Sequence, residues 1–280
     1  MSAASKVCLL TGASGTIGYA IAQALKASPA PPWHIIILGR REPPPSITHV
    51  DGRPPPTRPH DTFLAVDITD EAAVHAALDD HFASLRDSPD AAVQSLNRLD
   101  LLINCAGCSL GNEPIADVSA DTFRAVMEVN LVAPFILSKW ALSKMATPRG
   151  GRIINIGSVA NESPRLHAVP YTTSKYALTG LTRCLSVEGR FLSQTTKISA
   201  RDERDDDGTV GVVAVCQVSP GNVRSAIMSA EEAARREQEE GFVEAADVGA
   251  YVAAVASLPN TANVLESMIM PTRMPLVSRG

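Results

Sequence analysis

Three side chains stand at a spacing that suits proton transfer. Tyr171 and Lys175 are four residues apart at the head of a helical pattern, so they share one helix face. An ammonium group beside a phenol favours the phenolate, which lets the phenol exchange a proton with a bound molecule. Ser158 comes earlier, just after an apolar run over residues 152–156. If that run is a strand of an open parallel sheet, its carboxyl end places Ser158 at the ligand crevice.

A glycine-rich turn stands near the start of the chain, between a strand-like run over residues 7–10 and a helical pattern over 17–27. Glycines permit positive φ and allow backbone N–H groups to approach a pyrophosphate closely. The helix that follows presents free N–H groups and the positive end of its dipole to the anion. The context predicts a dinucleotide site, with a tight turn that binds nothing as the alternative. The residues assigned to the site are Gly12, Ser14, Gly15, Thr16, Ile17 and Gly18.

The cofactor is predicted from the end of the second strand-like run, residues 33–38. An NAD site usually places an acidic residue there, about 20 residues after the glycines. The sequence has Gly39-Arg40-Arg41 instead, and a guanidinium is a good partner for a 2′-phosphate. We therefore predict NADP(H), with NAD(H) the less favoured choice. The alternatives are that these arginines only end a solvated strand, or that Glu42 competes for one of them.

Short apolar runs alternate with longer helical patterns along the chain. The runs cover residues 7–10, 33–38, 62–66, 99–103, 152–156, 210–218 and 267–270, and helical patterns cover 17–27, 71–85, 122–145 and 172–191. This alternation is typical of an α/β fold with helices on both faces of the sheet. We predict one doubly wound Rossmann-type domain over residues 1–280, with a seven-stranded, mostly parallel sheet. Proline-rich and charge-rich stretches, at about 42–60 and 193–209, are interpreted as surface insertions.

These features together resemble the short-chain dehydrogenase/reductase family, in order, from about residue 6 to 225. The matching pieces are the turn at Gly12–Gly18, Asp67, Asn104-Cys105-Ala106-Gly107, Asn130, Ser158, Tyr171, Lys175 and Pro220-Gly221. The resemblance implies that Tyr171 gives a proton to a carbonyl oxygen as hydride arrives, or takes one from an alcohol. It implies that Ser158 stabilises the substrate oxygen and that Asn130 holds a water linking Lys175 to solvent. An ordinary packing role is the alternative for Asn130.

The same resemblance assigns the remaining cofactor contacts. Asp67 and Ile68 would contact the adenine, and Tyr171 and Lys175 would lie at the nicotinamide ribose. It implies that Asn104 ties the central strands together and that Gly107, next to Ala106, lets the cofactor approach. The nicotinamide would lie against Pro220, Gly221 and Val223, with Ser225 as a contact to its carboxamide; all seven are counted with the cofactor site. One departure is the glycine spacing, because Thr16 stands where the family commonly has its central glycine.

Composition limits the partners. The formal net charge of −5 argues against nucleic acid or an anionic membrane surface, and we see no run of 18 apolar residues and no signal peptide. The five cysteines are interpreted as reduced thiols of a cytoplasmic protein, and the Cys105/Cys108 pair has no second pair for zinc. No metal is expected.

The expected partner is a small-molecule carbonyl or alcohol substrate. Residues 223–241 either form a lid or an ordinary surface helix, and Arg165, Leu166, His167 and Val169 are candidates for the pocket rim. The resemblance also implies a homodimer or homotetramer built on the helices at 122–145 and 172–191. A non-catalytic NADP-binding scaffold or sensor is the alternative function.

Overall fold

The computed structural model describes residues 5–28, 31–43, 61–147, 149–195, 211–224 and 230–275. Most of the two predicted insertions, and Ser225, lie outside the described residues. The described chain forms a seven-stranded sheet in the order β3-β2-β1-β4-β5-β6-β7, and every pair in it is parallel. The strands are β1 (Lys6–Thr11), β2 (Trp33–Gly39), β3 (Thr62–Ala65), β4 (Leu101–Asn104), β5 (Gly151–Ile156), β6 (Val213–Pro220) and β7 (Glu266–Ile269).

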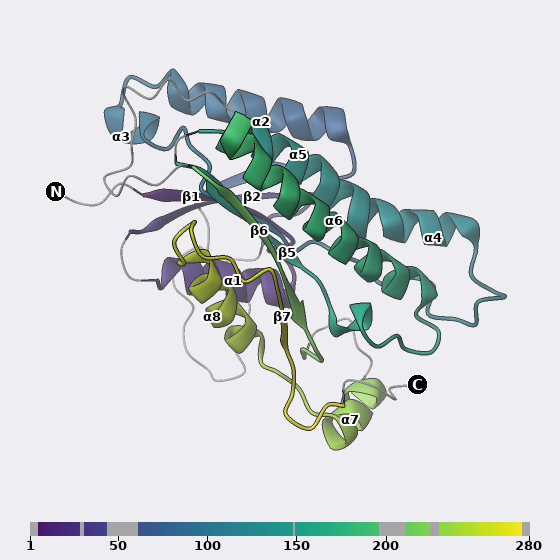
Figure 1. The fold of residues 1–280 in the computed structure, drawn as a ribbon. Coiled ribbons are helices and arrows are strands. Elements are labelled where there is room, and N and C mark those ends of the chain that lie inside the picture. The colour runs from purple at the N-terminus through teal and green to yellow at the C-terminus, as the bar shows by residue number, and fades with distance from the viewer. Residues whose placement is uncertain are drawn as a thin grey trace.

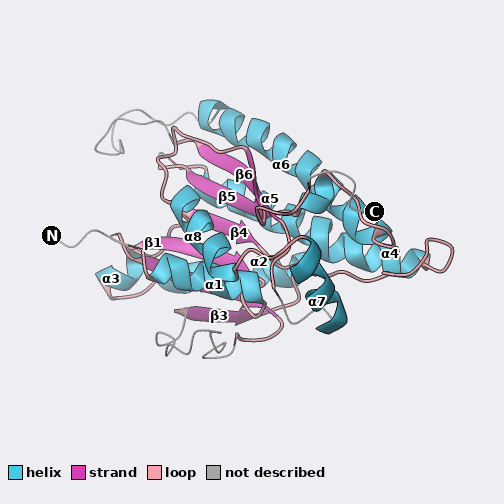
Figure 2. Ribbon diagram, turned by 90° about the horizontal axis from the view of Figure 1, so that it is seen from below, coloured by secondary structure: helices cyan, strands magenta, loops and turns pink. Residues whose placement is uncertain are grey.

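Helices cover both faces of this sheet (Figure 1). On one face, α1 (Thr16–Lys26) and α8 (Ala245–Ala256) lie side by side, as Figure 2 shows from below. The other face carries α2 (Glu71–Arg86), α4 (Ala120–Met127), α5 (Ala133–Met145) and α6 (Val169–Thr195). Two further helices, α3 (Ala91–Gln94) and α7 (Ala230–Glu239), lie at the periphery. The predicted fold class is therefore confirmed.

Strand burial explains why the apolar runs identify the sheet so well. Alternate residues of β1 enter opposite cores: Leu9 packs with α2 and α5, whereas Cys8 and Leu10 pack with α1 and α8. A strand covered on both faces has no polar side, so its sequence is continuously apolar.

The strand order fixes where a ligand can bind. The chain runs from β1 outward to β2 and β3, then returns to place β4 on the other side of β1. The connections after β1 and β4 therefore lead to helices on opposite faces of the sheet, and ligands of such folds bind in the crevice outside the carboxyl ends of these strands. The glycine turn follows β1, and Asn104 is the last residue of β4.

The predicted helix over residues 122–145 is interrupted. Between α4 and α5 lies a π-helical turn, η1 (Glu128–Val132), and Asn130 stands at its centre. By length and composition the stretch Ala120–Met145 would also be long and apolar enough to cross a membrane, although 56% of its most apolar window is buried. Leu137, Ala141 and Met145 enter the core against the sheet, which accounts for the apolar composition of α5.

Helix α6 is longer than predicted at both ends. It begins at Val169 and continues to Thr195, so the first residues of the predicted insertion at 193–209 are helical. The sixth strand also begins three residues later than predicted, at Val213, and ends at Pro220.

Candidate active site

The ammonium group of Lys175 lies between α6 and the end of β5. The residue is only 5% exposed, and its Nζ donates a hydrogen bond to the carbonyl oxygen of Ile156 at 3.0 Å. The same Nζ lies 5.6 Å from the centroid of the Tyr171 ring, one helical turn away. The structure thus holds a positive charge beside the phenol, at the strand end that leads to Ser158.

Ser158 connects β5 to a 3₁₀ turn, η2 (Val159–Asn161). Its Oγ accepts the backbone N–H of Ala160 at 3.2 Å and so caps this turn. A hydroxyl that accepts in this way still has its own proton to donate. Ser158 is therefore able to donate a hydrogen bond to an oxygen atom in the crevice.

Asn130 joins the loop after β4 to α6. Its Oδ1 accepts the N–H of Cys108 at 2.8 Å, and its Nδ2 donates to the Cys108 carbonyl and to Ser174 Oγ, both at 2.9 Å. Ser174 Oγ in turn donates to the Tyr171 carbonyl at 2.7 Å. π-helical turns of this kind occur often at functional sites. The side-chain oxygen and nitrogen of Asn130 are thus bonded within the protein. The water expected at Asn130 stays a prediction.

Gly107 lies against the same group of side chains. A Cβ placed on it would lie 3.3 Å from Asn130 Oδ1 and 3.8 Å from Lys175 Nζ. Close approach at this point therefore suits glycine, which leaves the space beside Asn130 Oδ1 and Lys175 Nζ free of a side chain.

The glycine turn is closed against the loop after β4. Gly12 has a φ of +73°, and a Cβ on it would lie 2.6 Å from the backbone nitrogen of Ala106. Gly18 lies against the Gly12 carbonyl too closely for any side chain. Helix α1 starts at Thr16, and its N-cap Gly15 supplies no side-chain hydrogen bond. The first turn of α1 therefore keeps N–H groups for an anion, so these residues fit the pyrophosphate of a dinucleotide.

One further residue of this region was not anticipated from the sequence. Thr11, at the end of β1, is 1% exposed, and its Oγ1 accepts the N–H groups of Cys105 and Ala106 at 3.1 and 3.2 Å. These bonds hold the loops after β1 and β4 together at the crevice. The only signal in the sequence was a threonine at the end of an apolar strand.

Asn104 ties the central strands together below the crevice. Its Nδ2 donates to Asn155 Oδ1 of β5 at 2.8 Å and to Ser138 Oγ of α5 at 3.2 Å. It is 3% exposed, so its role in the structure is to fix β4 relative to β5 and α5.

The ends of β2 and β3 form a charged side of the crevice. Arg40 and Arg41 are exposed, and within the described part of the chain neither forms a hydrogen bond or an ion pair. Asp67 accepts the N–H and the hydroxyl of Thr69 at 3.0 and 2.8 Å. These bonds, and then the charge of Arg40, hold the pKa of the Asp67 carboxyl below its usual range. Ile68, the other predicted adenine contact, is 9% exposed.

The loop after β6 is held in place on the opposite side. Pro220 is buried, the N–H of Gly221 donates to Ile269 of β7 at 2.8 Å, and Val223 pairs with Val243. The predicted contact Ser225 lies outside the described residues.

A mostly buried polar cluster lies beside this loop, and its contacts were not predicted from the sequence. Arg165 Nη2 donates to Asn222 Oδ1 at 3.0 Å and to Glu240 Oε2 at 2.6 Å. It joins the segment between Ser158 and Tyr171 to the loop after β6 and to the end of α7. In the same segment, His167 has a φ of +57°, in the left-handed region that non-glycine residues seldom adopt. The segment expected to rim the pocket is thus firmly anchored at Arg165.

The cysteines near the crevice are free thiols. Burial raises the pKa of Cys105 to about 12, and it also raises the pKa of Cys108. Both therefore stay protonated at neutral pH and are poor nucleophiles. Among the described residues, no group of three or more histidine, cysteine or acidic side chains is placed to hold a metal ion.

Comparisons with known proteins bear on the family and the fold of the chain. The sequence model described as short chain dehydrogenase matches residues 6–236. L-fucose dehydrogenase of Oryctolagus cuniculus is 30% identical over 220 residues, which is 79% of this chain but 63% of that protein. The chain thus spans less than two thirds of this relative's length.

Solved structures of low sequence identity share the fold. A serine dehydrogenase complexed with NADP⁺ superimposes with a TM-score of 0.69 at 20% identity, over 96% of each chain. A 4-hydroxyisoleucine dehydrogenase complexed with NADH gives a TM-score of 0.67 at 22% identity, over 95% of this chain and 97% of that one.

Proposed function

Because this chain belongs to the short chain dehydrogenase family, we propose that it is an NADP(H)-dependent oxidoreductase that moves a hydride between the nicotinamide and a small-molecule carbonyl or alcohol. Tyr171 is its general acid and base. The observation that carries the proposal is the buried ammonium of Lys175, 5.6 Å from the Tyr171 ring and bonded to the strand end that precedes Ser158. Burying an ammonium group is costly unless it is hydrogen-bonded, and buried titratable groups of this kind are found more often at functional sites.

The chain's own residues account for the proton side of the reaction. In the reducing direction, Ser158 donates a hydrogen bond to the carbonyl oxygen, and Tyr171 transfers its phenolic proton to that oxygen. The phenolate left behind is stabilised by the adjacent ammonium of Lys175. In the oxidising direction the phenolate accepts the proton of the alcohol. The nicotinamide, when bound, supplies or accepts the hydride.

The choice of NADP(H) rests on Arg40 and Arg41. Both are exposed just after β2, so a guanidinium and not a carboxylate follows the last strand residue, Gly39; the nearest acidic residue is Glu42. Solved structures of the same fold contain either cofactor, one NADH and one NADP⁺, so the fold does not decide between them. The two guanidinium groups favour a 2′-phosphate.

The proposal also includes a homodimer or homotetramer located in the cytoplasm. Several large apolar side chains of α5 and α6 are about half exposed, which supports a contact between copies through these helices. They are Phe135, Tyr176, Val187 and Phe191. Five free cysteines favour a reducing compartment.

A binding and turnover experiment tests the proposal. NADPH and NADH are titrated separately by cofactor fluorescence, and a panel of aldehydes and ketones is then screened for oxidation of the preferred cofactor. Tight NADPH binding with turnover supports an oxidoreductase. Tight NADPH binding without turnover on the panel or on alcohols in reverse favours the scaffold or sensor, and binding of neither cofactor contradicts both.

A further inference from the structure

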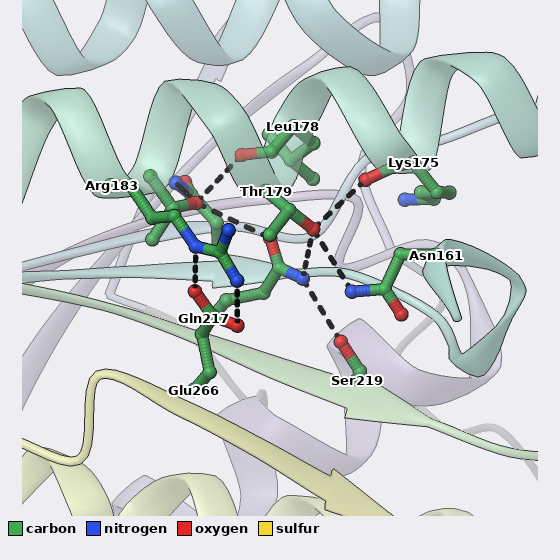
Figure 3. Close-up of polar contacts among 10 residues, drawn as sticks. Asn161, Lys175, Leu178, Thr179, Arg183, Gln217, Ser219 and Glu266 are labelled. Atoms are coloured by element: carbon green, nitrogen blue, oxygen red, sulfur yellow. Dashed lines mark hydrogen bonds and ion pairs between the residues drawn. The ribbon is translucent and has the colours of Figure 1, made fainter.

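Three polar side chains from three different elements meet between the sheet and α6, the helix that carries Tyr171 and Lys175 (Figure 3). Asn161 comes from η2, Thr179 from α6 and Gln217 from β6, and their exposed fractions are 5%, 7% and 1%. Buried polar groups are costly unless they are hydrogen-bonded, so a group of this kind fixes the geometry of whatever it connects.

Thr179 Oγ1 is the point where the three elements are joined. It accepts a hydrogen bond from Asn161 Nδ2 and another from Gln217 Nε2, both at 2.9 Å. Its own proton is donated to the carbonyl oxygen of Lys175 at 3.2 Å. One hydroxyl therefore links the backbone of Lys175 to the turn that Ser158 caps.

Asn161 carries the connection from this hydroxyl to Ser158. The backbone N–H of Asn161 donates to the Ser158 carbonyl at 3.0 Å, and Ser158 Oγ accepts the N–H of Ala160 in the same turn. A shift of Asn161 would therefore move both the backbone and the hydroxyl of Ser158.

Gln217 holds the hydroxyl of Thr179 from the side of the sheet. The second N–H of its amide donates to Ser219 Oγ at 3.0 Å, and its Oε1 accepts from Thr182 at 3.3 Å. A Cβ on Gly157 would lie 2.6 Å from both Gln217 Nε2 and Ser219 Oγ. The amide thus lies directly against the residue that precedes Ser158, and it has little freedom to move.

We infer that Thr179 is a positioning residue for the proposed reaction: held by Asn161 and Gln217, it sets the separation between Ser158 and the Tyr171–Lys175 pair. The inference rests on the proposed function, because it assigns a purpose to that separation. Reactions that depend on bound geometry lose rate steeply when a catalytic group is displaced, even by about 1 Å.

The test compares three substitutions on one helix. Thr179→Val keeps the shape but removes the hydroxyl, and Thr179→Ser keeps the hydroxyl. The matched control is Thr182→Val, because Thr182 is also buried in α6 and also contacts the Gln217 amide, at 3.3 Å from Oε1. It accepts from Asn155 Nδ2 at 2.9 Å but has no bond to Asn161 or to the Lys175 carbonyl, so it disturbs the same amide without breaking the link to Ser158. The kcat and KM with NADPH, the thermal midpoint, and amide hydrogen exchange over residues 158–161 are measured for each.

We expect Thr179→Val to lower kcat by about tenfold with KM and NADPH affinity changed less than about twofold. Exchange over residues 158–161 accelerates in this variant. Thr179→Ser restores both, and Thr182→Val lowers the thermal midpoint without either effect. Equal losses of kcat in Thr179→Val and Thr182→Val, or no loss in Thr179→Val, would overturn the inference.

The exchange measurement separates this inference from the proposed function. If the wild-type protein shows no turnover, the proposed function fails. Faster exchange over residues 158–161 in Thr179→Val alone would still show that Thr179 positions Ser158, and unchanged exchange would refute that.

Discussion

The ammonium nitrogen of Lys175 donates a hydrogen bond to the carbonyl oxygen of Ile156, 3.0 Å away. This bond joins the helix that carries Tyr171 to the last residue of β5, two residues before Ser158.

Replacing Lys175 by methionine should remove the charge while keeping most of the volume. We expect kcat to fall by at least about 10²-fold, because proton transfer from Tyr171 loses the cation that stabilises the phenolate. Steady-state kinetics over a range of pH measures this. Lys175→Arg should not restore the rate, because the Nζ lies in a buried site beside Gly107, and a wider guanidinium does not fit there. Full activity in Lys175→Met would contradict the role.

Alanine should have opposite effects on stability at Gly12, in the glycine turn, and at Gly180, in α6. Gly12→Ala should lower the free energy of unfolding by more than about 2 kcal/mol, because alanine is strained at a φ of +73° and its Cβ would collide with Ala106. Gly180→Ala, on an exposed part of α6 with nothing within 4 Å, should raise it by about 0.5–1 kcal/mol. Urea unfolding of both variants makes the comparison. A Gly12→Ala variant as stable as wild type would mean that the turn is not closed against the loop after β4.

The side chain of Arg40 should determine the preference for NADPH over NADH. Arg40→Ala should weaken NADPH binding by about tenfold or more, since a charge-assisted bond to the 2′-phosphate is lost, and should leave NADH binding nearly unchanged. Fluorescence titration of both cofactors, with and without added salt, measures the difference. Equal weakening of the two would show that Arg40 does not contact the 2′-phosphate.

Two histidines should make the fold less stable in acid. Burial, ahead of nearby charges, lowers the pKa of His34 and of His81 in the folded chain. Both rings therefore stay neutral in the folded chain at a pH where the same histidines of the unfolded chain, with their ordinary pKa of about 6.5, already bind a proton. The stability of the fold is therefore unaffected by this difference above about pH 6.5, and it falls as the pH drops below that value.

Urea unfolding at pH 7.5, 6.5 and 5.5 tests the effect of these histidines. The free energy of unfolding should decline over this range in the wild type. The decline should be smaller in a His34→Gln/His81→Gln variant. If both proteins lose stability equally, other groups carry the dependence.

The centre of the sheet could be predicted from the sequence because its inner strands are buried on both faces. Residues 35–38 of β2, Ile-Ile-Ile-Leu, are continuously apolar and mostly β-branched, which is typical of such a strand. The turn around Gly12 was also recognisable, because its glycines stand between a strand and a helix. Boundaries were less accurate where polar residues continue an element, as at the end of α6, where Ser193, Gln194 and Thr195 are still helical.

The contacts within the site could not be predicted in the same way. Pro134 is a local signal for the break at Asn130, because proline has no N–H to bond the Asn130 carbonyl, but the contacts of the Asn130 side chain with Cys108 and Ser174 depend on other elements. The roles of Thr11 and Thr179 likewise depend on partners far along the chain. Buried polar networks of this kind become visible only when the elements are packed together.

The most direct test of the central claim is a single-turnover measurement with enzyme in excess over NADPH and a carbonyl substrate identified in the screen. Wild-type protein and Tyr171→Phe are compared. The proposed mechanism predicts that Tyr171→Phe binds NADPH with wild-type affinity but oxidises it at least about 10²-fold more slowly. Oxidation at the wild-type rate in Tyr171→Phe would contradict the assignment of Tyr171 as the proton carrier.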